Sequence, residues 1–293
     1  MQIIKDINQM RGFSSGVRKE GLTIGFVPTM GALHNGHLAL VQKAKDVSDK
    51  VVMSIFVNPA QFSAGEDYNS YPRDIEGDVK KAEVNAVDAV FIPSVDELYP
   101  QGFGTLVEVK GVSENLCGAA RHGHFRGVAT IVLKLFNIVM PDKAVFGLKD
   151  YQQYIVIKKM VHDLDLDIEV IGIRTVRDED GLALSSRNSR LSADERMAAN
   201  VIPSGLKWAE DTFLKGEKDA RAIIEGIKKI MEKEPLVVIE YVKVCDVCTL
   251  KDIGQIDDKA LVAIAARIGR ARLIDNVVLK KRHGGNPLCK GHF

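Results

Sequence analysis

The first 175 residues alternate short apolar runs with amphipathic stretches. Five apolar runs are typical of buried strands: 24–27, 51–57, 88–92, 143–146 and 168–173. Four stretches between them repeat apolar positions at helical spacing: 33–46, 74–83, 128–140 and 151–163. A short further strand is expected at 107–110. This alternation predicts an α/β fold, a doubly wound parallel sheet of Rossmann-like type.

The pattern changes after about residue 175, where a polar loop (177–190) begins. Ser192 and Glu195 have the spacing of a capping box, and long helices follow to about residue 232. Three β-like runs come last: 237–244, 260–268 and 272–279. These elements predict a smaller α+β domain.

We therefore expect two domains and a tail. Residues 1–175 would form the Rossmann-like ligand-binding domain, and residues 176–279 a smaller α+β lid domain whose first loop folds back over the site. The basic tail, 280–293, contains Gly and Pro and is expected to be disordered.

Composition and charge narrow the partners. The 293 residues are 46% hydrophobic and 27% charged, as in soluble globular proteins, and the net charge is +1. Such a balance creates no global field for nucleic acid or an anionic membrane. The amino terminus lacks the apolar core of a signal peptide, and no apolar run approaches the roughly 18 residues of a membrane span. We expect a cytoplasmic protein with a local site for small molecules.

The first candidate chemistry lies in the stretch IGFVPTMGALHNGHLALV, residues 24–41. A strand that enters a helix through a Gly-containing turn can hold an anion at the helix N-terminus. His34 and His37 stand three residues apart and could face the same phosphate chain, while Gly36 lets a flat ligand approach. The stretch is neither a Walker loop nor GxGxxG. Read alone, it fits two solvated histidines equally well.

Two amides follow the second predicted strand. Asn58 and Gln61 stand where this strand ends, and ligands of open α/β sheets bind at such carboxyl ends. Uncharged amides suit the hydroxyl and carboxylate oxygens of a small substrate. The alternative is that they cap a turn.

A second polar turn follows the strand at 143–146. Lys149 could neutralise phosphate charge, and Asp150 could cap the next helix or bind a ribose or a metal-bound water. Gln153 lies one helical turn later. A surface Lys-Asp pair is the plain alternative.

The polar loop brings two hydroxyls and a guanidinium together in Ser185, Ser186 and Arg187. Loops of this kind commonly close over polyphosphate. A solvated loop would have the same composition. The segment 121–126 could be a second cationic patch or a solvated turn.

Cysteines invite a zinc interpretation that we do not favour. Cys245 and Cys248, together with Cys289 and His292, imitate the two halves of a zinc site. Cys245 lies in a β-like run, however, where positions three apart face opposite sides of a sheet.

Seven motifs occur together and in order: PTMGALHNGH, SIFVNPAQF, YPRD, HFRGV, FGLKDYQQ, DGLALSSRN and RLIDN. With them the chain resembles the pantothenate synthetase family from about residue 3 to residue 279. That family belongs to the nucleotidyltransferase superfamily, in which HxGH replaces the HIGH signature of class I aminoacyl-tRNA synthetases and the Ser-Ser-Arg loop replaces KMSKS. The resemblance implies a Rossmann-like nucleotidyltransferase fold.

The resemblance also implies an activity. It would be a ligase of pantothenate biosynthesis that condenses (R)-pantoate with β-alanine, cleaves ATP to AMP and pyrophosphate with Mg2+, and passes through a pantoyl adenylate. A homodimer is implied as well. The alternative is a nucleotidyltransferase of the same superfamily that acts on a phosphorylated small molecule, although the sequence offers amides where a second phosphate would need cations. An RNA-binding relative of synthetases is disfavoured by the neutral charge.

Carried over by position, the resemblance names site residues. The ATP site would comprise Met30, His34, His37, Gly147, Lys149, Asp150, Val176, Leu184, Ser185, Ser186 and Arg187. His34, His37 and Lys149 would be catalytic, with His37 the usual proton donor. Gln61 and Gln153 would hold pantoate, Gln61 lying also near β-alanine.

The chain departs from the family at a few positions. The family often has an acidic or amide residue at Leu148 and a Glu at Cys117. Only Asp78 matches the residues that contribute magnesium in some members, because Gly77 and Lys81 replace polar or acidic neighbours. Asp78 is therefore the one expected metal ligand.

Overall fold

The computed structural model describes residues 1–63 and 65–281. By internal packing the chain divides into two compact units, which are described separately. The first unit contains residues 1–109, 121–148 and 156–175, and the second contains 110–120, 149–155 and the chain from 176 onward. Two segments that precede residue 175 thus pack with the C-terminal part of the chain. Of the expected tail, residues 282–293 lie outside the described ranges.

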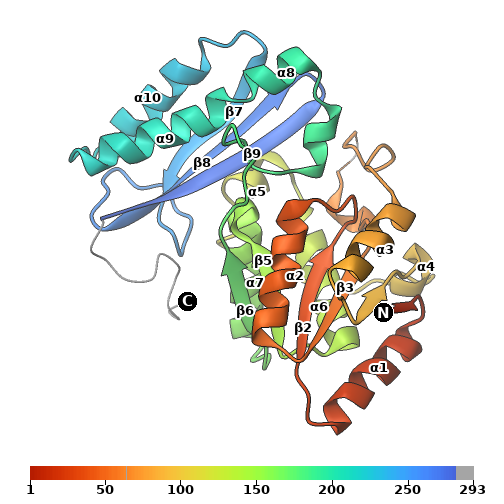
Figure 1. The fold of residues 1–293 in the computed structure, drawn as a ribbon. Helices are drawn as coiled ribbons and strands as arrows, with labels where there is room; N and C mark the ends of the chain where they lie inside the picture. Colours follow the sequence, from red (N-terminus) through yellow and green to blue (C-terminus); the bar gives the residue numbers. More distant parts are fainter. Residues whose placement is uncertain (64, 282–293) are drawn as a thin grey trace. The chain divides into compact units, whose positions relative to one another are not determined.

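The first unit is built on a wholly parallel sheet, as the alternating pattern predicted (Figure 1). Its strands are β1 (Gln2–Ile4), β2 (Ile24–Thr29), β3 (Lys50–Ile55), β4 (Ala89–Phe91), β5 (Lys143–Gly147) and β6 (Glu169–Ile173). They lie in the order β1-β4-β3-β2-β5-β6. From β2 the chain first builds outward through β3 and β4, and later continues on the other side through β5. The switch point, where ligands of such sheets bind, is therefore between β2 and β5.

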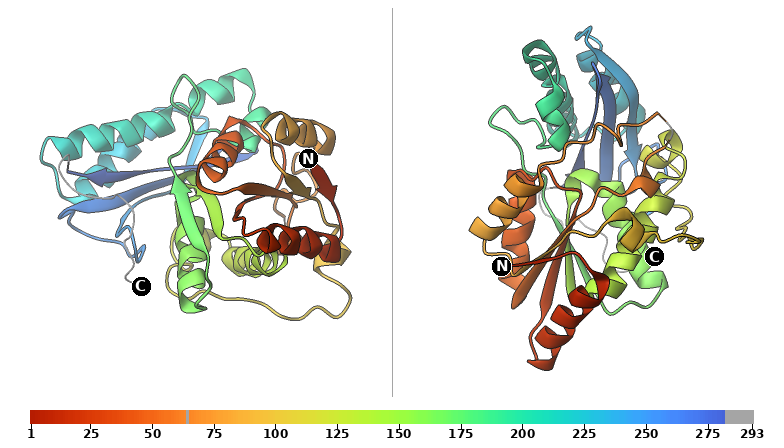
Figure 2. Two further views of the ribbon diagram at one scale, coloured as in Figure 1. Left: turned by 60° about the horizontal axis from the view of Figure 1, so that its bottom comes forward. Right: turned by 90° about the vertical axis from the view of Figure 1, so that its right-hand side faces the viewer.

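Helices cover both faces of this sheet (Figure 2). The helices are α1 (Ile7–Lys19), α2 (Asn35–Val47), α3 (Ile75–Val84), α4 (Val95–Leu98) and α6 (His124–Val139), with the 3-10 turn η1 (Pro59–Gln61). On β2, Val27 joins the core beneath α2 and α3, whereas the ring of Phe26 meets that of Phe136 on α6. Neighbouring residues of one strand thus serve opposite layers, because side chains alternate along a strand.

The second unit combines an antiparallel sheet with helices. Its sheet has the order β7 (Val237–Cys245), β8 (Lys259–Ile268), β9 (Ala271–Lys280), and its helices are α5 (Cys117–Ala120), α8 (Ala193–Ala198), α9 (Val201–Leu214) and α10 (Ala220–Met231). Helices α9 and α10 pack on the sheet around a core that includes Ile202, Ile223, Ile227 and Ile264. The turn η3 (Ser186–Arg190) lies in the polar loop.

Buried polar groups explain why two earlier segments pack with this unit. The turn η2 (Leu148–Asp150) leads into α7 (Tyr151–Asp163), and near its start Gln152 donates to the carbonyls of Val112 and Asn115. The Asn115 amide in turn donates to Asp252 over 2.7 Å. These contacts tie residues 110–120 and 149–155 to one another and to the loop after β7.

Most sequence-predicted elements are present with shifted ends. The capping box of Ser192 and Glu195 is confirmed at the start of α8. Helix α6 begins at His124 rather than at residue 128, and residues 107–110 form no strand. Strand β1 and helix α1 were not predicted from the sequence.

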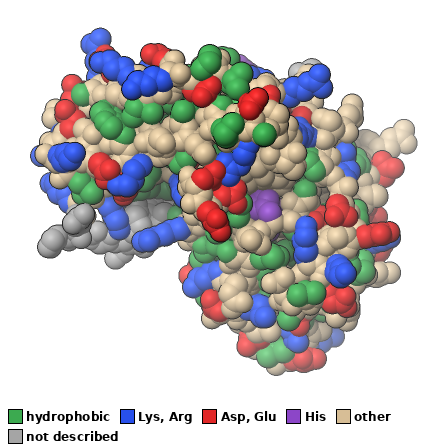
Figure 3. Space-filling model, turned by 45° about the horizontal axis from the view of Figure 1, so that its top comes forward, with side chains coloured by type: hydrophobic (Ala, Val, Ile, Leu, Met, Phe, Trp, Pro, Cys, Tyr) green, Lys and Arg blue, Asp and Glu red, His purple; other side chains and the backbone are tan. Residues whose placement is uncertain are grey.

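Neither the charge on the face in view nor the described helices suggest a membrane-spanning chain. Acidic and basic side chains are interspersed on the face shown in Figure 3. Within residues 1–63 and 65–281, no helix is both long and apolar enough to cross a bilayer.

Close packing of α6 against η1 requires a glycine. A Cβ on Gly127 would lie 2.1 Å from the carbonyl oxygen of Ala60. We predict that Gly127→Ala lowers the free energy of unfolding by about 2 kcal/mol or more, because backbone must move to relieve the overlap. Urea denaturation measures this change. The matched control is Gly16→Ala on α1, where nothing lies within 4 Å of the added Cβ and no loss is expected. Equal stability of both variants would contradict the prediction.

Candidate functional site

The loop between β2 and α2 has an unusual backbone that a buried carboxylate supports. Gly31 and Ala32 both have positive φ, +79° and +50°. Asp78 on α3 is fully buried, and its two oxygens accept the N–H groups of Ala32 and Leu33, each over 2.7 Å. The Lys81 ammonium, one turn along α3, donates to the Leu33 carbonyl over 2.7 Å. Helix α3 thus fixes the loop that precedes the two histidines.

The two histidines cap the helix that follows. His34 is the N-cap of α2 with an extended backbone, so the helix begins at Asn35 and not at residue 33 as expected. The Nδ1 atom of His34 accepts the Gly36 N–H over 3.1 Å, and Nδ1 of His37 accepts the His34 N–H over 3.3 Å. The ring centroids are 4.1 Å apart. The structure therefore brings the rings together, although His34 is not helical.

This capping decides which ring nitrogen carries the hydrogen. A nitrogen that accepts a backbone N–H has no proton, so in the neutral ring of His34 and of His37 the proton is on Nε2. Each Nε2–H is then a donor suited to a phosphate oxygen. One of the first N–H groups of α2 is not open to an anion, because the His34 ring accepts the Gly36 N–H.

Asn58 is buried among protein partners. Its Oδ1 accepts the Ala60 N–H over 3.2 Å and the Tyr99 hydroxyl over 2.8 Å. Its Nδ2 donates to the Gly127 carbonyl and to Gln61 Oε1, both over 3.1 Å. Every polar group of the Asn58 amide is therefore occupied, which favours the turn-capping alternative over direct substrate binding for this residue.

Gln61 is better placed for a ligand. Its Nε2 donates to Sδ of Met30 over 3.1 Å, and sulfur is a weak acceptor. This contact joins a residue expected at ATP with one expected at pantoate. Met30 is the first residue of the β2–α2 loop, so the first unit brings the histidine loop and Gln61 to the same sheet edge.

A charged network contacts the backbone carbonyl of Gln61. It includes residues of the segment 121–126, whose role could not be decided from the sequence. His124 Nδ1 lies 2.8 Å from the Gln61 carbonyl, and Arg121 lies 3.0 Å from His124 Nε2. Since arginine can only donate, His124 Nε2 accepts and its Nδ1–H donates to Gln61. Glu66 pairs with Arg121 over 2.6 Å. Partial burial opposes ionisation of Glu66, but the hydrogen bonds and charge of Arg121 lower its pKa overall.

Other residues that were predicted to bind ATP, Lys149, Asp150 and the Ser-Ser-Arg loop, belong to the second unit. Lys149 comes two residues after β5 and pairs with Asp150 over 3.8 Å. Ser185 caps η3 by accepting the Arg187 N–H, and a cavity of about 10 Å³ is lined by both Lys149 and Ser185. The structure thus brings Lys149 close to the Ser-Ser-Arg loop within this unit.

Strand β9 holds these segments through residues to which the sequence analysis gave no role. Asn276 donates to the Lys149 carbonyl over 2.9 Å. Asp275, which is 3% exposed, binds the guanidinium of Arg177 through both carboxylate oxygens. Both residues lie in RLIDN, a motif that signalled their importance without showing their partners.

The remaining expected residues have simpler settings. Gly147 ends β5, and the Leu184 N–H donates to the Val176 carbonyl over 3.0 Å, which closes the base of the polar loop. Ser186 and Gln153 are partly exposed. The neighbouring Gln152 is instead buried, and it donates a hydrogen bond to the Val112 carbonyl.

The geometry gives Asp78 a different task from the expected metal ligand. Both of its oxygens already accept backbone N–H groups at full burial. Within residues 1–63 and 65–281, moreover, no group of three or more His, Cys, Asp or Glu side chains has the arrangement of a metal site. We therefore assign none of the described residues as a ligand of a resident metal. Cys289 and His292, half of the zinc alternative, lie outside the described residues.

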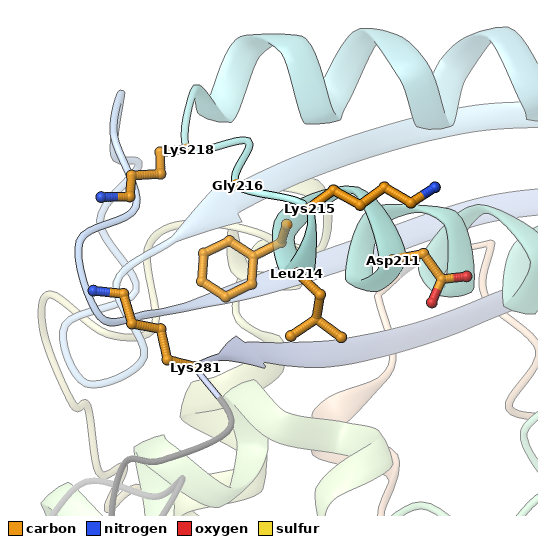
Figure 4. Close-up of a pocket in the computed structure, with 7 residues that line it drawn as sticks. Asp211, Leu214, Lys215, Gly216, Lys218 and Lys281 are labelled. Atoms are coloured by element: carbon orange, nitrogen blue, oxygen red, sulfur yellow. The ribbon is translucent and has the colours of Figure 1, made fainter.

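A separate cavity in the second unit lacks the features of a site. It measures about 670 Å³ and lies at the end of α9. Lys218 and Lys281 extend to one side of it and Lys215 to the other (Figure 4). Because these charges diverge, the cavity offers no convergent set of polar groups.

Comparison with known proteins places this geometry in context. The family model described as pantoate-beta-alanine ligase matches residues 2–278. A pantothenate synthetase from Thermotoga petrophila is 52% identical over 279 residues, which cover 95% of this chain and 100% of that protein. One from Caldicellulosiruptor saccharolyticus is 49% identical over 280 residues, covering 96% and 100%.

Solved structures agree with the sequence relatives. A pantothenate synthetase from Thermus thermophilus superposes with a TM-score of 0.89 at 41% identity, covering 94% of this chain and 99% of that one. A pantoate-beta-alanine ligase from Francisella tularensis, in complex with beta-gamma ATP and beta-alanine, gives 0.79 at 35% identity, covering 95% and 97%.

The role of Asp78 can be tested by stability. In Asp78→Asn an amide nitrogen would face a backbone N–H, so we predict a loss of about 2 kcal/mol in the free energy of unfolding. The loss should be the same with and without Mg2+ in urea denaturation. Asp74→Asn is the control, because Asp74 caps α3 through Gly77 and asparagine caps equally well. If Mg2+ stabilised the wild type but not Asp78→Asn, Asp78 would be a metal ligand after all.

Proposed function

The chain belongs to the pantoate-beta-alanine ligase family, and from this premise we propose how its residues divide the work of the reaction. The enzyme uses ATP to join pantoate to β-alanine through a C–N bond. The strongest support for a division of roles lies in the first unit, where Met30 links the paired histidine loop to the donor amide of Gln61.

We propose two chemical steps, because a carboxylate does not react with an amine near neutral pH. The pantoate carboxylate attacks the α-phosphorus of ATP, and the bond to pyrophosphate breaks. The amine of β-alanine then attacks the acyl carbon of the pantoyl adenylate, a C–N bond forms, and AMP leaves. Neither step needs a nucleophile from the protein.

His34 and His37 would serve the first step. Their Nδ1 atoms belong to the helix cap, so each neutral ring presents an Nε2–H. Such donors are already oriented when charge builds on the phosphate oxygens, and preorganised donors stabilise a transition state strongly. The N-terminus of α2 adds a partial positive charge.

Gln61 and Gln153 would hold pantoate by its oxygens. Gln61 has an amide that other side chains fix, and Gln153 stands in the first turn of α7. Neutral donors can orient the acid without withdrawing much charge from the oxygen that attacks.

Lys149 and Arg187 would supply cationic charge to the triphosphate. The ATP site would be completed through backbone, hydroxyl and carboxylate groups of Gly147, Asp150, Val176, Leu184, Ser185 and Ser186. We propose that residues 176–279 act as a lid domain and that the loop at 185–187 closes over the adenylate, keeping water from the mixed anhydride.

Magnesium would arrive as part of the ATP substrate. The ion screens triphosphate charge, and the described residues supply no group that we assign as its ligand. We also propose a homodimer in the cytoplasm, as the family resemblance implies.

The reaction is tested by product analysis. Mass detection should find pantothenate and AMP only when ATP, pantoate and β-alanine are all present. Formation of a dinucleotide from ATP and a phosphorylated acceptor would favour the alternative nucleotidyltransferase.

The adenylate step predicts an isotope exchange. Labelled pyrophosphate should enter ATP when pantoate is present and β-alanine is absent, since the first step is then reversible on the enzyme. The control omits pantoate. An enzyme that forms pantothenate without this exchange would argue against a separate adenylate.

The histidine pair predicts a large effect on turnover. His37→Ala should lower kcat by about a hundredfold or more, the usual scale for a lost transition-state contact. His162→Ala on α7, whose side chain is 57% exposed, is the control and should keep normal turnover. Near-normal kcat in His37→Ala would remove this residue from the mechanism.

A further inference from the structure

The orientation of the Asn58 amide is fixed by two backbone groups whose polarity cannot change. The Ala60 N–H can only donate, so the atom 3.2 Å away is the Asn58 oxygen. The Gly127 carbonyl can only accept, so the atom 3.1 Å away is the Asn58 nitrogen. Asn58 is only 1% exposed, and no rotation of its amide satisfies both groups in the opposite sense.

This orientation determines that of Gln61. The second hydrogen of Asn58 Nδ2 points to Gln61 over 3.1 Å, so the Gln61 atom there must be the acceptor Oε1. The Nε2 group of Gln61 is then on the other side of its amide, toward Met30. Gln61 is 8% exposed, and it presents donors rather than an acceptor on that side.

Tyr99 reinforces the same polarity. Its hydroxyl donates to Asn58 Oδ1 over 2.8 Å, and burial raises the pKa of Tyr99 to about 12, so the hydroxyl keeps its proton. Gly127 makes the arrangement possible, because a Cβ there would collide with the backbone of Ala60. The direction of donation runs from Tyr99 through Asn58 to Gln61.

We propose that Asn58 and Tyr99 are positioning residues that hold the Gln61 amide with its NH2 group toward the acid substrate. The inference rests on the proposed role of Gln61 in binding pantoate. On this inference the subsite selects an acceptor oxygen, such as that of a carboxylate. The reason is that a relay of hydrogen bonds, anchored on the backbone, orients the Gln61 amide.

Tyr99→Phe tests the outer end of the relay. Losing one donor to Asn58 should raise KM for pantoate about five- to tenfold, the usual scale of a hydrogen bond, with kcat within about threefold. KM for ATP should not change. Tyr154→Phe is the matched control, because Tyr154 is 3% exposed and has no place in the relay.

Two substitutions of Asn58 test polarity itself. In Asn58→Ala the Gln61 amide can still turn its NH2 toward pantoate, whereas in Asn58→Asp the carboxylate would draw that NH2 away from the substrate. Asn58→Asp should therefore raise KM for pantoate at least about tenfold more than Asn58→Ala, although aspartate is the closer match in shape. A purely structural role predicts the opposite order.

The outcomes separate the inference from the function beneath it. A wild-type enzyme that makes no pantothenate would overturn the proposed function. An active wild type whose pantoate KM is unchanged in Tyr99→Phe would overturn the relay alone, and so would a lower KM in Asn58→Asp than in Asn58→Ala. Should either Asn58 variant fail to fold, Tyr99→Phe alone decides.

Discussion

A buried carboxylate determines the backbone on which the histidine pair stands. Asp78 accepts the N–H groups of Ala32 and Leu33 with both oxygens, and Lys81 binds the carbonyl of Leu33. Left-handed backbone is costly for a residue with a Cβ, by roughly 1–2 kcal/mol, so Ala32 needs such compensation. These hydrogen bonds stabilise the backbone conformation that places His34 at the N-cap of α2.

In both histidines the nitrogen that caps the helix is not the nitrogen that we propose for the chemistry. In each ring Nδ1 belongs to the cap of α2, and this sets the proton on Nε2. Their tautomer is therefore a consequence of helix capping rather than of a neighbouring acid. A side chain that replaced either ring would lose a capping contact, worth about 1 kcal/mol, as well as the donor that we propose for the nucleotide. Histidine suits both helix capping and the proposed donation, because its ring has two nitrogens.

How much the sequence predicts depends on the range of the interactions. Local periodicity was enough for strands β2 to β6 of the first unit and for the β-strands of the second, and the turn before α7 was identified from its polar residues. Gly123, at φ +77°, is the N-cap of α6, so this helix begins at His124. The predicted start was later because His124 and Arg126 are polar and interrupt the apolar pattern there. The hydrogen bonds of Asp78 to Ala32 and of Asn58 to Gly127 could not be predicted, since these partners lie 46 and 69 residues away.

Neutral recognition of the acid has a chemical reason. A cation bound to the pantoate carboxylate would stabilise the very charge that must attack phosphorus, whereas an amide N–H orients the oxygen and leaves most of its charge in place. The residues fit the role proposed for them: Gln61 would present a donor to pantoate, and Asn58, held by the backbone groups of Ala60 and Gly127, orients the Gln61 amide. The charged group nearest Gln61 in the network, Arg121, is turned to its carbonyl and to Glu66 instead. The Arg121 charge therefore lies on the backbone side of Gln61 and not on the side that we propose for pantoate.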